Sequence, residues 1–141
     1  MKRFFLALTL ALPAAALVTP ALAVPAFAQS TANLAPADRY FGRMKMSILG
    51  IRNALKDLSA QIDAHPDDTD RVFDKAVLVE DALHDWQVHF PFDPWIPRFT
   101  YTLAQLYGKL DSDDARTHRH DMLNWLGATY PESEFAQLSR E

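Results

Sequence analysis

The chain has 141 residues, a formal net charge of −4 and no cysteine. The acidic balance argues against a nucleic-acid-binding protein, because such proteins neutralise phosphates with a basic surface. The lack of cysteine excludes disulfide bonds, so the fold must be stabilised by packing or by association with a partner.

The first 28 residues have the pattern of a secretory signal peptide. Two basic residues precede an apolar run from Phe4 to Val18, and the small-x-small sequence Ala26-Phe27-Ala28 follows. We expect cleavage after Ala28, with a cut after Ala23 as the alternative. The rest of the chain has no apolar stretch of the ~18 residues that a transmembrane helix requires. The sequence therefore predicts a mature protein in the periplasm or outside the cell, without a transmembrane segment.

The mature chain is predicted to form one all-α domain. Residues 29–36 are small and polar, so we expect a flexible N-terminus, followed by a single helical domain over residues 37–141. No segment alternates apolar and polar residues with a period of two, which argues against a β-sheet. We expect four to five helices, the first of them long and amphipathic.

The first helix is expected to begin after Pro36 and to run to residue 63. Its apolar residues recur at steps of three and four, which places them on one side of a helix. A kink or break is expected between Ser47 and Gly50, because glycine in a helix interior costs ~1 kcal/mol relative to alanine. We expect the stripe to face the protein's own core, with a homodimeric coiled coil through the stripe as the alternative. The stripe consists of Phe41, Met44, Ile48, Ile51, Leu55, Leu58 and Ile62.

The same segment is basic in an acidic chain. Residues 37–63 contain five basic and three acidic side chains, whereas the remainder of the mature chain is strongly acidic. We expect this helix to lie partly against the acidic remainder.

Three further helices and a tail follow. Apolar residues at steps of three and four predict helices over residues 69–89, 95–110 and 115–130. A short amphipathic tail is expected over residues 132–140.

The segment 89–99 joins the second and third helices and contains three prolines. Proline fixes φ and removes a backbone donor, so Pro91 should end one helix and Pro94 or Pro97 should lie in the first turn of the next. Large aromatic side chains are costly to leave in water, so we expect those of this corner to be packed. They are Phe90, Phe92, Trp95 and Phe99.

The corner is repeated 40 residues later in the chain. At this offset Pro91 aligns with Pro131, Phe90 with Tyr130, and Trp95 with Phe135. We therefore expect Tyr130-Pro131 to form a second, equivalent junction between helices.

The segment 94–140 resembles a tetratricopeptide (TPR) repeat. Leu103, Ala104 and Tyr107 match the large, small and aromatic positions of the first helix of that repeat. Ala115 matches the small position early in its second helix, and Pro131 the proline that ends it. The resemblance implies antiparallel helical hairpins and a protein-interaction or assembly scaffold, exported and without catalysis of its own.

Such a scaffold would bind a protein partner in a groove lined by the third helix. The expected lining residues lie off the apolar stripe of that helix and are Arg98, Tyr101 and Gln105. Arg98 is suited to bidentate binding of a partner carboxylate. An ion pair between Arg98 and Asp93 is the simpler expectation.

A small helical carrier of a metal or another ligand is the functional alternative. Glu80 and His84 are four residues apart on one helix face, and His118 has the same relation to Asp114. The candidate ligands are therefore Glu80, His84 and His118, although neither pair belongs to a metal-binding motif such as His-Glu-x-x-His. The chain has no nucleophile elbow and no glycine-rich phosphate loop, so we expect neither an enzyme nor a bound cofactor.

Overall fold

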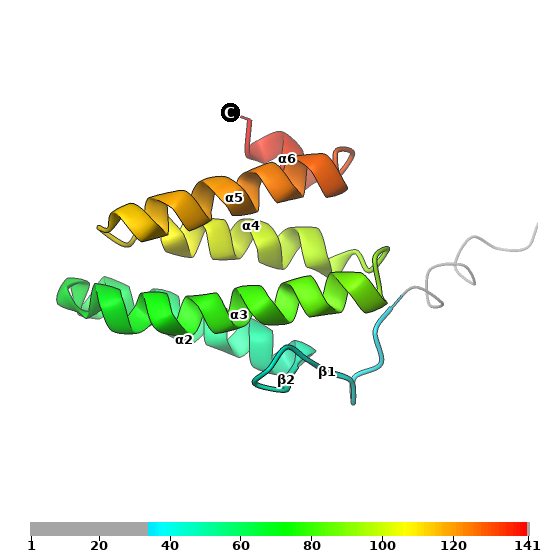
Figure 1. The fold of residues 1–141 in the computed structure, drawn as a ribbon, viewed down its shortest axis with the longest axis horizontal. Coiled ribbons are helices and arrows are strands. Elements are labelled where there is room, and N and C mark those ends of the chain that lie inside the picture. Colours follow the sequence, from blue (N-terminus) through cyan, green and yellow to red (C-terminus); the bar gives the residue numbers. More distant parts are fainter. Residues whose placement is uncertain (1–33, 141) are drawn as a thin grey trace, which may run out of the picture.

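The helices are stacked in the order in which they follow one another in the chain. The computed structural model describes residues 34–140, and the predicted signal peptide with its cleavage site after Ala28 lies outside this range. The β1–β2 hairpin lies beside α2 and α3 at one end of the stack, and α6 lies at the other end (Figure 1). The elements are β1 (Tyr40–Phe41), β2 (Met46–Ser47), α2 (Ile48–Ala64), the 3-10 helix η2 (Pro66–Asp68), α3 (Thr69–His89), α4 (Trp95–Tyr107), α5 (Asp113–Thr129) and α6 (Glu134–Leu138).

The all-α prediction is confirmed. The second predicted helix has the observed bounds of α3, Thr69–His89. The third ends earlier than expected, because α4 stops at Tyr107 rather than at residue 110. In the part of the chain that the structure describes, no helix has both the length and the apolar character needed to cross a bilayer.

The first helix begins at Ile48, so the prediction of a helix from residue 37 is wrong for its N-terminal part. In its place Tyr40 pairs with Ser47 and Phe41 with Met46 in a two-residue antiparallel ladder. This small hairpin also corrects the expectation of a chain without any sheet. Phe41 is nevertheless buried, as the stripe predicted, because its ring stacks on a tryptophan of α3 with a centroid distance of 5.3 Å.

A turn and a cap decide where the helix starts. Gly42 has a φ of 66°, a left-handed conformation that glycine adopts at little cost and that no helix contains. Ser47 is the N-cap of α2, and its Oγ accepts a hydrogen bond from the backbone N–H of Gly50 at 3.0 Å. The break predicted between these two residues is therefore the start of the helix.

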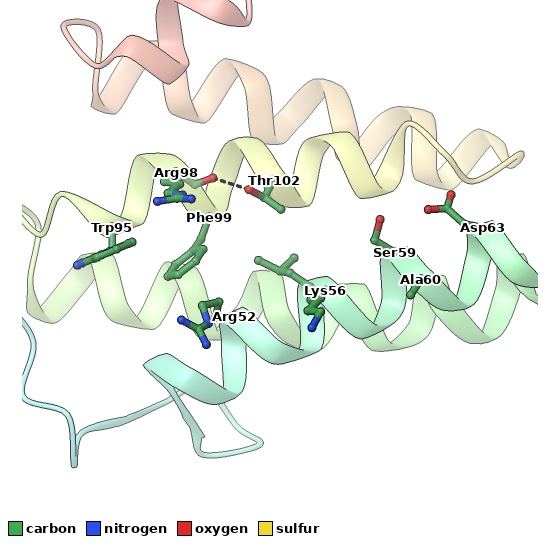
Figure 2. Close-up of a pocket in the computed structure, with 10 residues that line it drawn as sticks. Arg52, Lys56, Ser59, Ala60, Asp63, Trp95, Arg98, Phe99 and Thr102 are labelled. Carbon is green, nitrogen blue, oxygen red and sulfur yellow. Dashed lines mark hydrogen bonds between the residues drawn. The ribbon is translucent and has the colours of Figure 1, made fainter.

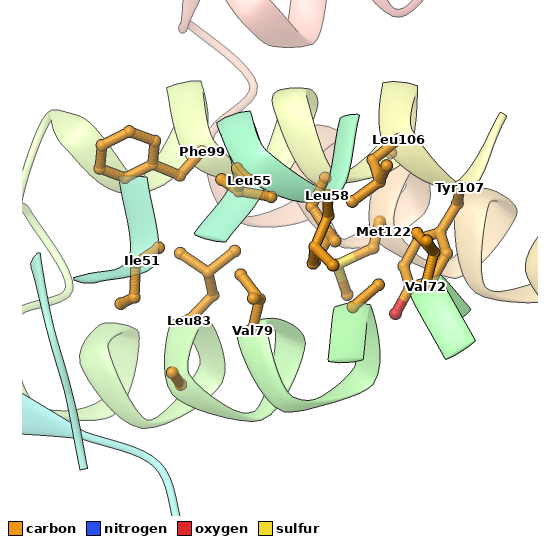
Figure 3. Close-up of a cluster of buried hydrophobic side chains, with 14 of the residues drawn as sticks. Ile51, Leu55, Leu58, Val72, Val79, Leu83, Phe99, Leu106, Tyr107 and Met122 are labelled. Atoms are coloured by element: carbon orange, nitrogen blue, oxygen red, sulfur yellow. The ribbon is translucent and has the colours of Figure 1, made fainter. Parts of the chain in front are cut away.

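The apolar stripe of α2 faces the core of its own chain, as expected. Figure 3 shows its side chains among those of α3 and α4. Four of its members on α2 are no more than 5% exposed, whereas Ile48 at the start of the helix is partly exposed. The buried stripe residues are Ile51, Leu55, Leu58 and Ile62.

The proline corner is packed only in part. Pro94 precedes α4 and Pro97 is buried in its first turn, as predicted, while Pro91 lies exposed in the turn between the helices. The expectation of packed aromatic residues is wrong for two of the four, because Phe92 is 75% exposed and Trp95 is 43% exposed.

A buried carboxylate, rather than these two aromatic side chains, fixes the conformation of the corner. Asp93 is 1% exposed and accepts three hydrogen bonds. The donors are the backbone N–H of Ala35 at 2.8 Å, Nε1 of Trp86 at 3.2 Å and the backbone N–H of Trp95 at 3.0 Å. Asp93 therefore ties the start of the described chain to α3 and α4. Ala35, which belongs to the segment 29–36 that was expected to be flexible, is buried and bonded to this carboxylate.

The second junction, Tyr130-Pro131, joins α5 to α6. Tyr130 is the C-cap residue of α5, and Pro131 is exposed in the turn that follows. Beyond it, Phe135 of α6 packs on Tyr101 of α4 at a centroid distance of 6.0 Å. The hydroxyl of Tyr130 is buried and has no hydrogen-bond partner among residues 34–140.

Candidate functional site

A groove between α2 and α4 is the largest cavity that we describe. It has a volume of about 520 Å³ and is open to solvent along the two helices (Figure 2). The lining residues are Arg52, Leu55, Lys56, Ser59, Ala60 and Asp63 of α2, and Trp95, Arg98, Phe99 and Thr102 of α4. We call it the α2/α4 groove.

The charge of the α2/α4 groove is positive. Arg52, Lys56 and Arg98 are exposed, and none of them forms an ion pair with another side chain in residues 34–140. The one acidic side chain of the groove, Asp63, is bound by Nζ of Lys109 at 2.7 Å and is thereby neutralised. Arg52, Lys56 and Arg98 are thus available to bind an anionic group, although the protein is acidic overall.

Aromatic rings form one wall of the groove. The rings of Trp95 and Phe99 are stacked at 5.9 Å, with 21° between their planes. The guanidinium of Arg98 lies 5.5 Å from the centroid of the Trp95 ring, within the range of a cation–π interaction. The expected ion pair between Arg98 and Asp93 is not formed, because Asp93 is buried and bonded to other donors.

A smaller apolar cavity extends the groove toward the start of the described chain. It has a volume of about 250 Å³ and shares Arg52, Trp95 and Phe99 with the α2/α4 groove. The remaining walls come from Leu49 and from the segment around Ala35, among others. The cationic region is therefore continuous with an apolar region.

The structure places only one of the three predicted partner-binding residues in the groove. Arg98 lines it. Tyr101 instead packs on Phe135, and Gln105 is exposed outside the cavity. Sequence reasoning missed Arg52 and Lys56, although their spacing of four residues within the basic segment 37–63 was the signal that could have identified them.

The three candidate metal ligands, Glu80, His84 and His118, lie close together, with Glu80 between the two histidines. Its Oε2 accepts hydrogen bonds from Tyr107 OH at 2.7 Å and from Nδ1 of His118 at 2.8 Å. Nε2 of His84 lies 3.9 Å from the other oxygen. No group of three such side chains within residues 34–140 has an arrangement that could hold a metal ion.

The Glu80 cluster connects three helices. Glu80 belongs to α3, Tyr107 to α4 and His118 to α5, so one hydrogen bond joins α3 to α4 and the other joins α3 to α5 across the end of α4. Burial raises the pKa of Tyr107, and the hydrogen bond to Glu80 and its negative charge raise it further. We therefore assign the cluster a structural role.

Comparison with known proteins gave no match to the chain among family models, curated proteins or solved structures.

Proposed function

We propose that this chain is an exported protein-interaction module, without catalysis of its own, that binds an acidic segment of another protein in the α2/α4 groove. The observation that carries the proposal is the set of three cations without ion-pair partners, Arg52, Lys56 and Arg98, around a wall of aromatic rings. Arginine and lysine bind carboxylates, and aromatic residues beside arginine are enriched where binding energy concentrates in interfaces.

The dimensions of the groove suit a short peptide. Its α2 side extends from Arg52 to Asp63, and a helix rises 1.5 Å per residue, so the groove is roughly 17 Å long. An extended peptide covers ~3.3 Å per residue, so about five residues fill this length. An acidic side chain would bind the cations, and an apolar or aromatic residue would fill the neighbouring cavity beside Leu49.

The order of packing supports the hairpin arrangement that the TPR resemblance implies. α2 packs on α3, α3 on α4 and α4 on α5, and α2 also contacts α4 directly. Alternate helices, α2 and α4, thus form the walls of the groove. A stack of hairpins presents such continuous surfaces to extended partners.

The proposal is tested with a displayed library of random heptapeptides. We expect the selected peptides to be enriched in Asp and Glu next to an aromatic or large apolar residue. The double substitution R52A/R98A should weaken binding of a selected peptide by on the order of tenfold, or about 1.4 kcal/mol, measured by fluorescence anisotropy.

The matched control is R119A. Arg119 is an exposed cation on α5, outside the α2/α4 groove, and its removal should change the affinity less than twofold. Binding should also weaken as salt is raised. Selected peptides without acidic residues, or equal affinity for the double variant and the unmodified protein, would contradict the proposal.

A further inference from the structure

A second groove lies on the other side of α2, and we propose that it binds a second copy of this chain. The groove has a volume of about 360 Å³ and lies between the β1–β2 hairpin, α2 and α3. Its lining is mostly apolar and consists of Met44, Met46, Ala54, Leu58, Leu78 and Val79, with Asp57, Gln61 and Lys75 as the polar residues. We call it the end groove, because the β1–β2 hairpin that lines it lies at one end of the helical stack (Figure 1).

The hairpin covers only one part of this end of the stack. Gly42 donates a hydrogen bond to Asp85 at 2.8 Å, and Arg43 donates one to Asp81 at 2.8 Å. Both acceptors belong to the C-terminal half of α3. Lys75, Leu78 and Val79, near the middle of α3, line the open end groove. At the other end of the stack, α6 covers α4 and α5, so the two ends are not equivalent.

The charges at the end groove favour a second copy over a partner of one charge. Asp57 on α2 and Lys75 on α3 line the same groove, are both exposed, and form no ion pair within the described part of the chain. A uniformly acidic partner would bring a like charge to Asp57, and a uniformly basic partner would bring a like charge to Lys75. In the dimer that we propose, a two-fold axis through the groove pairs each Asp57 with the Lys75 of the other copy, so the ion pair forms twice.

The area of the surface around the end groove and its flexible methionine side chain are consistent with a reversible dimer. α2 has 17 residues and is therefore about 25 Å long, and the face of two adjacent helices is about 20 Å wide. Such a face buries at most about 1,000 Å² in total, near the lower limit for a specific interface. Met44 is 59% exposed, and flexible methionine side chains adapt to an opposing apolar surface. We therefore expect a dissociation constant in the micromolar range.

Sedimentation equilibrium of the purified protein tests this inference. The unmodified chain should show a concentration-dependent monomer–dimer equilibrium, and L78D should be monomeric. The control V88D places the same charge on the same helix at a side chain that is 72% exposed and outside the end groove, so its dimer should be unchanged. A strict monomer at every concentration, or a dimer that L78D leaves intact, would overturn the proposal.

Exchange of the two charges gives a test that does not depend on a half-buried residue. D57K and K75D should each weaken the dimer by about tenfold or more, because each brings like charges together twice. An equimolar mixture of D57K with K75D should dimerise at least as tightly as the unmodified chain, since both contacts then join opposite charges. The proposal fails if the mixture dimerises no better than the two variants alone.

Discussion

The hydroxyl groups of Tyr107 and Tyr130 differ in whether they have a hydrogen-bond partner. Tyr107 donates a hydrogen bond to Glu80 at 2.7 Å, whereas the buried hydroxyl of Tyr130 has no partner in residues 34–140. Y107F should lower the free energy of unfolding by about 1–3 kcal/mol, because it leaves the partly buried carboxylate with one donor fewer. Y130F should be neutral or stabilising by up to about 1 kcal/mol, because it removes an unpaired polar group.

Urea denaturation of both variants measures the difference. The two substitutions delete the same atom, so they serve as controls for each other. Equal destabilisation by Y107F and Y130F would contradict the assigned roles.

The sequence shows which charged and aromatic residues could form a site, but it does not show which residues they contact in the fold. The carboxylate of Asp93 was expected to pair with Arg98, five residues away on an exposed surface. It accepts instead from Ala35, 58 positions away, and from the indole of Trp86. A pattern of local spacing contains no information on such a distant donor. The candidate groove illustrates the same limit, since Arg52 and Lys56 were visible as basic residues but not as neighbours of Arg98.

At the scale of elements, two glycines show which backbone positions are constrained. A Cβ at Gly42 would lie 2.8 Å from Cα of Ala82, and the φ of 66° is unfavourable for any side chain. Gly127 lies within α5 and has nothing within 4 Å of the same position. G42A should therefore lower the free energy of unfolding by about 2–3 kcal/mol, because it strains the hairpin and displaces it from α3.

G127A is the matched control and should have the opposite sign. Alanine is a better helix former than glycine by about 1 kcal/mol, and the added methyl group meets no neighbour. Thermal unfolding followed by circular dichroism gives both signs. A G42A protein as stable as the unmodified chain would show that the hairpin does not dock on α3 as described.

Helices with strong apolar periodicity were predictable, and the N-terminal hairpin was not. Phe41 and Met44 continue the period of the α2 stripe, so spacing alone favoured a longer helix. The hairpin forms because Gly42 takes a left-handed conformation, Ser47 caps the helix, and Phe41 gains a stacking partner on α3. The first two signals are local and weak, and the third exists only in the folded chain.

At the scale of the molecule, α2 separates two surfaces of different chemistry. One side carries the cations of the α2/α4 groove, and the other the apolar lining of the end groove. The stripe between them is buried in the core. Both proposals can therefore hold together, and a dimer through the end groove would present two peptide-binding grooves, which raises the avidity for a partner with repeated segments.

The whole molecule should lose stability above pH 10. Burial, followed by the charge of Asp93, raises the pKa of Tyr130 to about 12, and burial and Glu80 raise that of Tyr107. In the unfolded chain both phenols have a pKa near 10. The unfolded state thus releases these protons first, so the stability is fully present below pH 10 and is lost as the pH rises toward 12.

A pH titration that records circular dichroism and phenolate absorbance together checks this expectation. Part of the phenolate signal should appear only with the loss of helical structure, because Tyr107 and Tyr130 ionise on unfolding. The double variant Y107F/Y130F should retain its helical signal to a higher pH than the single variant Y107F, since neither phenol remains to be ionised. Complete ionisation near pH 10 in a protein that keeps its helical signal would show that these two hydroxyl groups are not buried.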